Sequence, residues 1–101
     1  MRIGVTNSKQ AAMLLTVNTL SANREWVRVA DVRSELLDMT GHQIGVGLKY
    51  MQKNDLLEMH QQREADSVTN KLKMVRYYRL TNEGRKEVRA LLRMRKQVET
   101  A

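Results

Sequence analysis

The segment TGHQIGVGLKYMQKND, residues 40–55, has the apolar spacing of a helix, although it holds three of the five glycines in the chain. Ile44, Leu48 and Met51 recur at i, i+4 and i+7, so they share one face of a helix over residues 41–53. The closing Asn-Asp pair tolerates the left-handed backbone conformation in which many helices end. The segment therefore predicts an amphipathic helix with one buried face.

The opposite face of this helix carries polar and basic side chains. It consists of His42, Val46, Lys49 and Lys53, with Gln43 and Tyr50 beside it. Such a face suits the major groove of DNA, where glutamine can pair with adenine and valine can touch a thymine methyl group. The two lysines can neutralise phosphates.

The glycines need a separate explanation, because glycine in a helix interior costs about 1 kcal/mol relative to alanine. Gly47 leans toward the buried face, where it lets another helix pack closely. Gly45 lies beside the outer face, where it admits a DNA backbone or a base edge, and Gly41 starts the helix. The alternative is that all three reflect packing or drift. A phosphate-binding loop is not expected, because the spacing is G-x-x-x-G-x-G and no Gly-Lys-Ser/Thr follows.

The rest of the chain predicts an α+β, mostly helical fold in one domain over residues 1–101. The expected elements are a helix over 8–21, a short strand over 26–29, a helix over 30–38, a hairpin within 56–80 and a helix over 82–98. Thr81 is expected to cap the last helix.

Apolar residues at regular spacing predict the core of this domain. The first helix contributes Met13, Leu14, Val17 and Leu20, the second contributes Val32, Leu36 and Leu37, and the last contributes Val88, Leu91, Leu92 and Val98. Trp26 and Tyr78 are expected in the core, and Tyr77 on the surface.

Composition narrows the range of functions. The chain has no cysteine, which excludes disulfides and cysteine-based zinc sites. Its two histidines have no acidic neighbour at ligand spacing, and its carboxylates are scattered, so we expect no metal, no cofactor and no enzyme activity. No apolar stretch reaches the roughly 18 residues of a membrane span, and no signal pattern opens the chain. We therefore expect no membrane contact and a cytoplasmic location.

The net charge of +7 is unevenly distributed. Residues 1–70 carry eight Lys or Arg and eight Asp or Glu, whereas residues 71–101 carry ten and three. The C-terminal part therefore holds the whole excess. A basic excess indicates an acidic partner, with nucleic acid first and a membrane surface second.

Two further segments carry a resemblance to a known family. LKYMQKNDLLEM, residues 48–59, resembles the end of a recognition helix that enters the first strand of a wing. RYYRLTNEGRKEV, residues 76–88, resembles the passage from the second wing strand into the next helix. In this order and spacing they resemble the winged helix-turn-helix domain of bacterial MarR- and PadR-type regulators, over about residues 8–98.

The resemblance implies roles for individual residues. Thr40 would cap the recognition helix and touch a phosphate, while His42, Gln43 and Val46 would face base edges and Lys49 would reach the backbone. In the wing, the residues implied are Arg63, Asn70, Lys71 and Lys73, which would reach a minor groove or phosphates. Two departures are Gly45-Val46, where such helices often carry Ser or Arg, and Asp55, where the family usually has Gly. The first predicts weak direct base readout.

Taken together, these features predict a transcriptional regulator, such as a repressor, that acts by occupying duplex DNA. A homodimer through the first and last helices would match two half-sites. An alternative is a winged-helix interaction module that binds an acidic protein, such as a polymerase or another regulator. A third reading is binding of RNA or non-specific DNA through the basic last helix.

Overall fold

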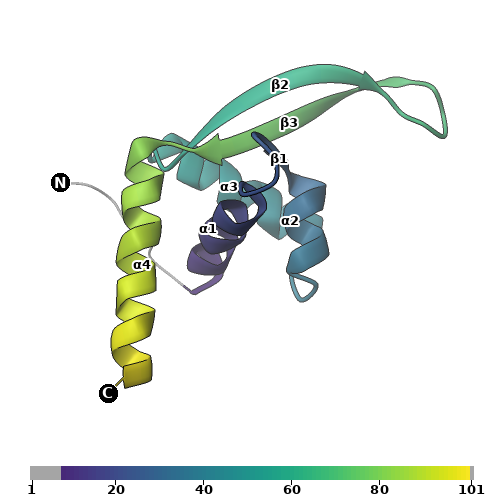
Figure 1. Cartoon of the computed structure of the whole chain (residues 1–101). Helices are drawn as coiled ribbons and strands as arrows, with labels where there is room; N and C mark the ends of the chain where they lie inside the picture. Colours follow the sequence, from purple (N-terminus) through teal and green to yellow (C-terminus); the bar gives the residue numbers. More distant parts are fainter. Residues whose placement is uncertain (1–7, 101) are drawn as a thin grey trace.

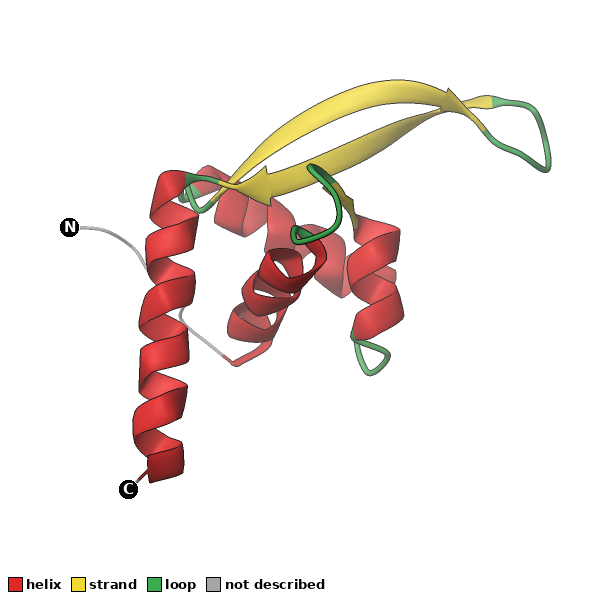
Figure 2. Ribbon diagram, in the orientation of Figure 1, coloured by secondary structure: helices red, strands yellow, loops and turns green. Residues whose placement is uncertain are grey.

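The computed structural model describes the backbone of residues 8–100 and the side chains of residues 8–94. Within this part of the chain lie four helices and a three-stranded antiparallel sheet (Figure 1). Their bounds are α1 Ser8–Leu20, β1 Val27–Arg28, α2 Val29–Glu35, α3 Gly41–Lys53, β2 Leu57–Ala65, β3 Leu72–Leu80 and α4 Asn82–Thr100. The α+β, mostly helical prediction is confirmed, as the colouring of Figure 2 makes plain.

The sheet has the strand order β1-β3-β2 and lies along one side of α1, α2 and α3 (Figure 1). In the hairpin, Leu57 pairs with Leu80 at the base and Ala65 pairs with Leu72 near the turn. The half of the hairpin nearest the turn extends beyond the helices, and the molecule is elongated, with extents of 53 × 28 × 24 Å (Figure 1). The hairpin is therefore a projecting wing.

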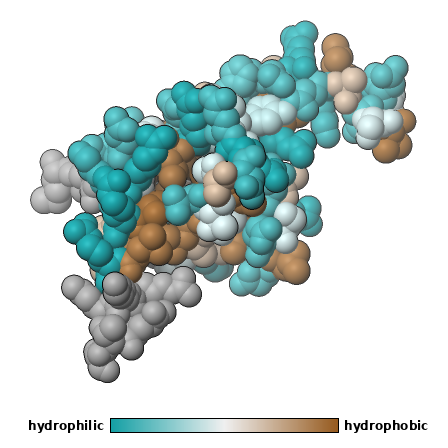
Figure 3. All heavy atoms as spheres, viewed as in Figure 1, coloured by the Kyte–Doolittle hydropathy of each residue, from teal (hydrophilic) through white to brown (hydrophobic). Residues whose placement is uncertain are grey.

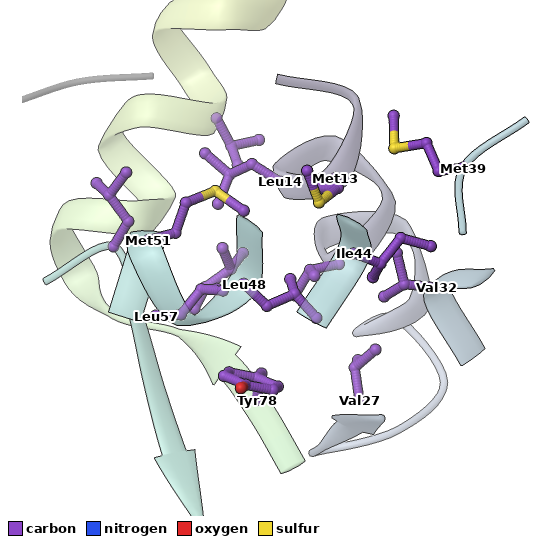
Figure 4. Packing of buried hydrophobic residues seen from close by; sticks show 14 residues of the cluster. Met13, Leu14, Val27, Val32, Met39, Ile44, Leu48, Met51, Leu57 and Tyr78 are labelled. Carbon is purple, nitrogen blue, oxygen red and sulfur yellow. The ribbon is translucent and has the colours of Figure 1, made fainter. Parts of the chain in front are cut away.

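The core lies between the three helices and the base of the sheet (Figure 4). Helix α3 supplies Ile44, Leu48 and Met51, all fully buried, which is the face that its spacing predicts. Tyr78 of β3 is buried against these helices, as expected. Full burial of one such side chain contributes about 1.5–3 kcal/mol, so α3 is held mainly by its apolar face.

Helix α2 differs from the prediction of 30–38, because it spans Val29–Glu35. The chain leaves the helix at Leu36 and turns, which leaves Leu37 85% exposed. Met39 turns back into the core instead, where it is 7% exposed. The prediction of Leu37 as a core residue is wrong, since helical spacing no longer applies once the helix has ended.

Smaller differences occur at the other element ends. The first helix ends at Leu20 rather than 21, the short strand spans only Val27–Arg28, and α4 continues past 98 to Thr100. Leu92 is 45% exposed rather than buried. The side chain of Val98 lies outside the described residues.

Trp26 is only half-buried, so the expectation of a core residue is wrong. Its ring lies under the guanidinium of Arg79, with 4.3 Å between the guanidinium carbon and the ring centroid. Arg79 also pairs with Glu25 and Glu58. Because residues alternate between the two faces of a sheet, these groups lie on the face turned away from the helices, which is called the outer sheet face below.

Candidate nucleic-acid interface

Helix α3 begins with a capping box. The Thr40 hydroxyl accepts a hydrogen bond of 3.1 Å from the Gln43 amide, and the Gln43 Oε1 accepts one of 3.0 Å from the Thr40 amide. Met39 and Ile44 flank this box, both buried, in the positions of a hydrophobic staple. The start of α3 is therefore fixed in direction by local contacts.

This geometry gives Gln43 a role that the base-contact prediction did not include. Its side-chain oxygen is engaged at the start of the helix, whereas a bidentate contact with adenine needs both the oxygen and the amide nitrogen. A bidentate contact would therefore open the capping box. The spacing Thr-x-x-Gln at residues 40–43 is the signal from which this role could have been found.

The outer face of α3 is exposed. His42, Lys49 and Lys53 are exposed, and Val46 is 56% exposed. These side chains are on the opposite side of the helix from the buried stripe, so they form one continuous surface. We refer to His42, Val46, Lys49 and Lys53 as the α3 face.

The strand register divides the predicted wing residues between two faces. Arg63 lies opposite Met74, on the same face of the hairpin as the buried Tyr78, and so points to the side on which the helices lie. Lys73 lies on the outer sheet face, with its Nζ 3.9 Å from Oδ2 of Asp66. The wing therefore offers Arg63 and Lys73 in opposite directions.

The wing turn is held by Asp66. Its Oδ1 accepts hydrogen bonds from the amides of Val68 (2.8 Å) and Thr69 (3.3 Å), and these bonds lower the pKa of the carboxyl group. Asn70 adopts a left-handed conformation with φ 57°, a position that asparagine tolerates. Asn70 and Lys71 are both exposed at this turn, which leaves them accessible to a partner.

Two exposed arginines on the helix side were missed from the sequence. Arg76 lies two residues before the buried Tyr78, so it shares the helix-side face of β3 beyond the core. Arg33 of α2 lies over the start of α3, where its Cδ and Nη1 would be 3.7 Å from a Cβ at Gly41. The period of two from Tyr78 could have indicated Arg76, whereas Arg33 depends on how α2 crosses α3.

Ion pairing separates the basic residues into two groups. Ion pairs join cations of the loop after α1, the outer sheet face and α4 to carboxylates: Arg24 and Arg28 with Asp31, Arg79 with Glu25 and Glu58, Lys73 with Asp66, and Lys86 with Glu83. On α4 itself, Arg85, Arg89 and Arg93 have no such pair within the part of the chain whose side chains are described. Among described residues, no ion pair joins a carboxylate to Lys49, Lys53, Arg63 or Lys71. Their charge therefore remains available to an anionic partner.

Other kinds of site find little support in the described chain. No group of three His, Cys, Asp or Glu residues within it could hold a metal ion. None of its helices has both the length and the apolar character needed to cross a membrane.

The arrangement of helices and wing matches solved structures. The complex of S. aureus MepR with DNA matches with a TM-score of 0.64 and 18% identity, over 93% of this chain and 60% of that chain. A PadR-like transcriptional regulator from Bacillus cereus matches with a TM-score of 0.64 and 20% identity, over 91% of this chain and 87% of the other. BpsR of Bordetella bronchiseptica matches with a TM-score of 0.64 and 14% identity, over 94% and 63%.

These matches define the fold as a winged helix-turn-helix, with α2 and α3 as the helix pair and β2–β3 as the wing. The resemblance to MarR- and PadR-type regulators is therefore confirmed at the level of the fold. The chain spans about three fifths of the length of the MepR and BpsR chains. No protein-family model matches the sequence, and no curated protein matches it.

Proposed function

We propose that this protein is a transcriptional regulator that binds duplex DNA, with the α3 face in the major groove and the wing on the adjacent backbone. The observation that carries the proposal is the exposed α3 face, whose two lysines have no carboxylate partner among the described residues. The S. aureus MepR structure, which shares the fold, is a complex with DNA. We place the protein in the cytoplasm, together with its DNA.

The dimensions of α3 suit this role. At a rise of 1.5 Å per residue, a helix of this length is about 20 Å long, and the major groove, about 12 Å wide, admits an α-helix. Lys49 and Lys53 would neutralise phosphates beside the groove. Arg63 and Arg76 extend the positive charge to the helix side of the wing. Thr40 would add a contact at the start of α3, and Lys71 would add one at the wing turn.

Base readout by this face would be limited. Val46 offers a methyl contact to thymine, and His42 offers one ring nitrogen to a base edge. Gln43 contributes its amide N–H groups while its oxygen remains in the capping box. We therefore expect modest sequence preference and a large electrostatic share of the affinity.

A homodimer would increase the number of contacts. Helix α4 packs against α1, and hydrophobic surface remains exposed in the recess between them (Figure 3). Leu92 and Met94 of α4 are 45% and 62% exposed. Pairing of two copies through this surface would present two α3 faces to half-sites about 10 base pairs apart.

Selection of bound sequences from a random pool of duplex DNA tests the proposal. The expected result is enrichment of a motif with two half-sites, bound with an affinity that falls as salt rises. Replacement of both Lys49 and Lys53 by alanine should make the salt dependence shallower by about 0.9 per lost phosphate contact. Lys86→Ala is the matched control, because Lys86 is on α4 and pairs with Glu83.

Two results would contradict the proposal. The absence of enrichment and of salt-dependent binding at low salt would favour an acidic protein as the partner. Equal losses in the α3 variant and the Lys86→Ala control would show that α3 is not the contact surface.

A further inference from the structure

We infer that Gly45 marks the point at which the DNA backbone approaches α3 most closely, and that its missing side chain makes this approach possible. The inference rests on the proposed DNA binding and adds to it a residue that acts through backbone shape. It follows from a comparison of the glycines with the space around each of them.

Two glycines are explained by contacts inside the protein. A Cβ atom at Gly47 would lie 2.4 Å from Cε and 2.6 Å from Sδ of Met13, so α1 packs directly on this position. A Cβ atom at Gly84 would lie 2.0 Å from the carbonyl oxygen of Leu56. The Leu56 backbone leaves no room for a side chain at Gly84, whereas a side chain at Gly47 would displace the end of the flexible Met13 side chain.

No contact of this kind explains Gly45. A Cβ atom there would meet no atom within 4 Å, and no described glycine has a positive φ. Alanine would therefore fit without strain, and it has the higher helix propensity. The fold would gain stability from a side chain at this position, so no contact within the described protein accounts for the glycine.

The surroundings of Gly45 indicate what kind of partner would approach it. Helical spacing places Gly45 next to the α3 face, one turn before Lys49 and one turn after Gly41. The Arg33 side chain lies over the Gly41 position. A gap bordered by an exposed lysine and an exposed arginine suits a chain of phosphates, which needs both positive charge and close approach.

The test compares Gly45→Ala and Gly45→Leu with the parent protein, using the duplex that the parent selects. Thermal unfolding should show Gly45→Ala at or above the melting temperature of the parent. Fluorescence anisotropy should show its Kd raised about tenfold, the size of effect produced by one disrupted contact in such an interface, and raised further for Gly45→Leu. Ala22→Leu is the control, because it adds bulk at an exposed position in the turn after α1 and should leave the Kd unchanged.

The outcomes separate this inference from the proposed function. If Gly45→Ala binds the duplex as tightly as the parent, the inference is wrong and DNA binding stands. A lower melting temperature for Gly45→Ala would also overturn it, because the glycine would then serve the fold. If the parent selects no duplex, the proposed function fails, and the inference fails with it.

Discussion

Single residues connect the end of α3 to the start of α4 at the base of the wing. Asp55 ends α3 with φ 63°, and its carbonyl oxygen accepts a hydrogen bond from the Thr81 hydroxyl. Thr81 in turn caps α4, since its Oγ1 accepts a bond of 3.0 Å from the Gly84 amide. The sequence predicts the cap at Thr81 and the left-handed site at residues 54–55 from residue type alone. Their contact could not be predicted, because the two positions are 26 residues apart.

Gly84 should be the least replaceable of the described glycines. Gly84→Ala would drive a Cβ into the backbone of Leu56, which cannot move without shifting the start of β2. Overpacking of this kind costs about 1–3 kcal/mol, and urea denaturation would measure the loss. Gly41→Ala is the matched control, since its Cβ would meet Arg33 at an ordinary 3.7 Å. Equal stability of the two variants would show that the α4 junction tolerates a side chain.

At the scale of elements, periodic patterns predict the helices and strands more reliably than they predict the orientation of side chains at element ends. The spacing of Ile44, Leu48 and Met51 predicts the buried face of α3, because a helix has only one way to bury that set. Helical spacing places Gln43 at the same position whether or not a capping box forms. Periodicity therefore does not reveal that its side-chain oxygen accepts a hydrogen bond from the Thr40 amide. The predictions of Leu37 and Trp26 as core residues are wrong for a related reason, since each residue lies at or beyond the end of its element.

Helix α2 depends on Asp31 in its first turn. Burial alone would raise the pKa of the Asp31 carboxyl, but hydrogen bonds from the Arg28 amide (2.9 Å) and from the guanidinium groups of Arg24 and Arg28 lower it overall. A lowered pKa in the folded state gives stability that is complete above the unfolded value of about 3.9 and is lost as the pH falls through the folded value.

Asp31→Asn should therefore destabilise the protein most at neutral pH. The difference in the free energy of unfolding between the parent and Asp31→Asn should shrink as the pH falls below about 4. Urea denaturation over a series of pH values measures it, with Asp38→Asn, at an exposed turn position, as the control. A difference that stays constant down to pH of about 3 would contradict this account of the α2 contacts.

The two faces of the wing should contribute unequally to DNA binding. Arg63→Ala and Arg76→Ala remove cations from the helix side, where no described carboxylate pairs with them. Each should weaken binding and reduce the salt slope by about 0.9. Lys73→Ala removes a cation that faces the other way and pairs with Asp66, so it should have a smaller effect. A larger loss for Lys73→Ala would mean that DNA lies on the outer sheet face.

For the molecule as a whole, net charge indicates a class of partner but not the place where it binds. Residues 71–101 hold the whole excess of +7 in the sequence, yet three of their cations pair with carboxylates: Lys73 with Asp66, Lys86 with Glu83, and Arg79 with Glu25 and Glu58 from distant segments. Cations on α3, in the charge-neutral part of the sequence, have no such partners among the described residues. Only the packed structure reveals this distribution, because it depends on contacts between segments far apart in the chain.

The proposed homodimer makes a prediction at the same scale. Leu92→Glu places a charge on the exposed apolar surface of α4 and should convert a dimer into a monomer. Light scattering coupled to size-exclusion chromatography measures the mass, and Leu37→Glu, at an 85% exposed position in the turn after α2, is the matched control. The monomer should bind a duplex with two half-sites more weakly than the parent does. An unchanged mass for Leu92→Glu would place the dimer contact elsewhere or show that there is none.

The most direct test of the central claim is to locate the contact surface by amide chemical shifts as the selected duplex is added to the labelled protein. We predict that the largest changes fall in Gly41–Lys53 of α3, with further changes along the helix side of the wing at Arg63 and Arg76. The outer sheet face around Trp26 should change little. Changes confined to α4, with α3 unaffected, would contradict the account and assign nucleic-acid binding to the basic C-terminal helix.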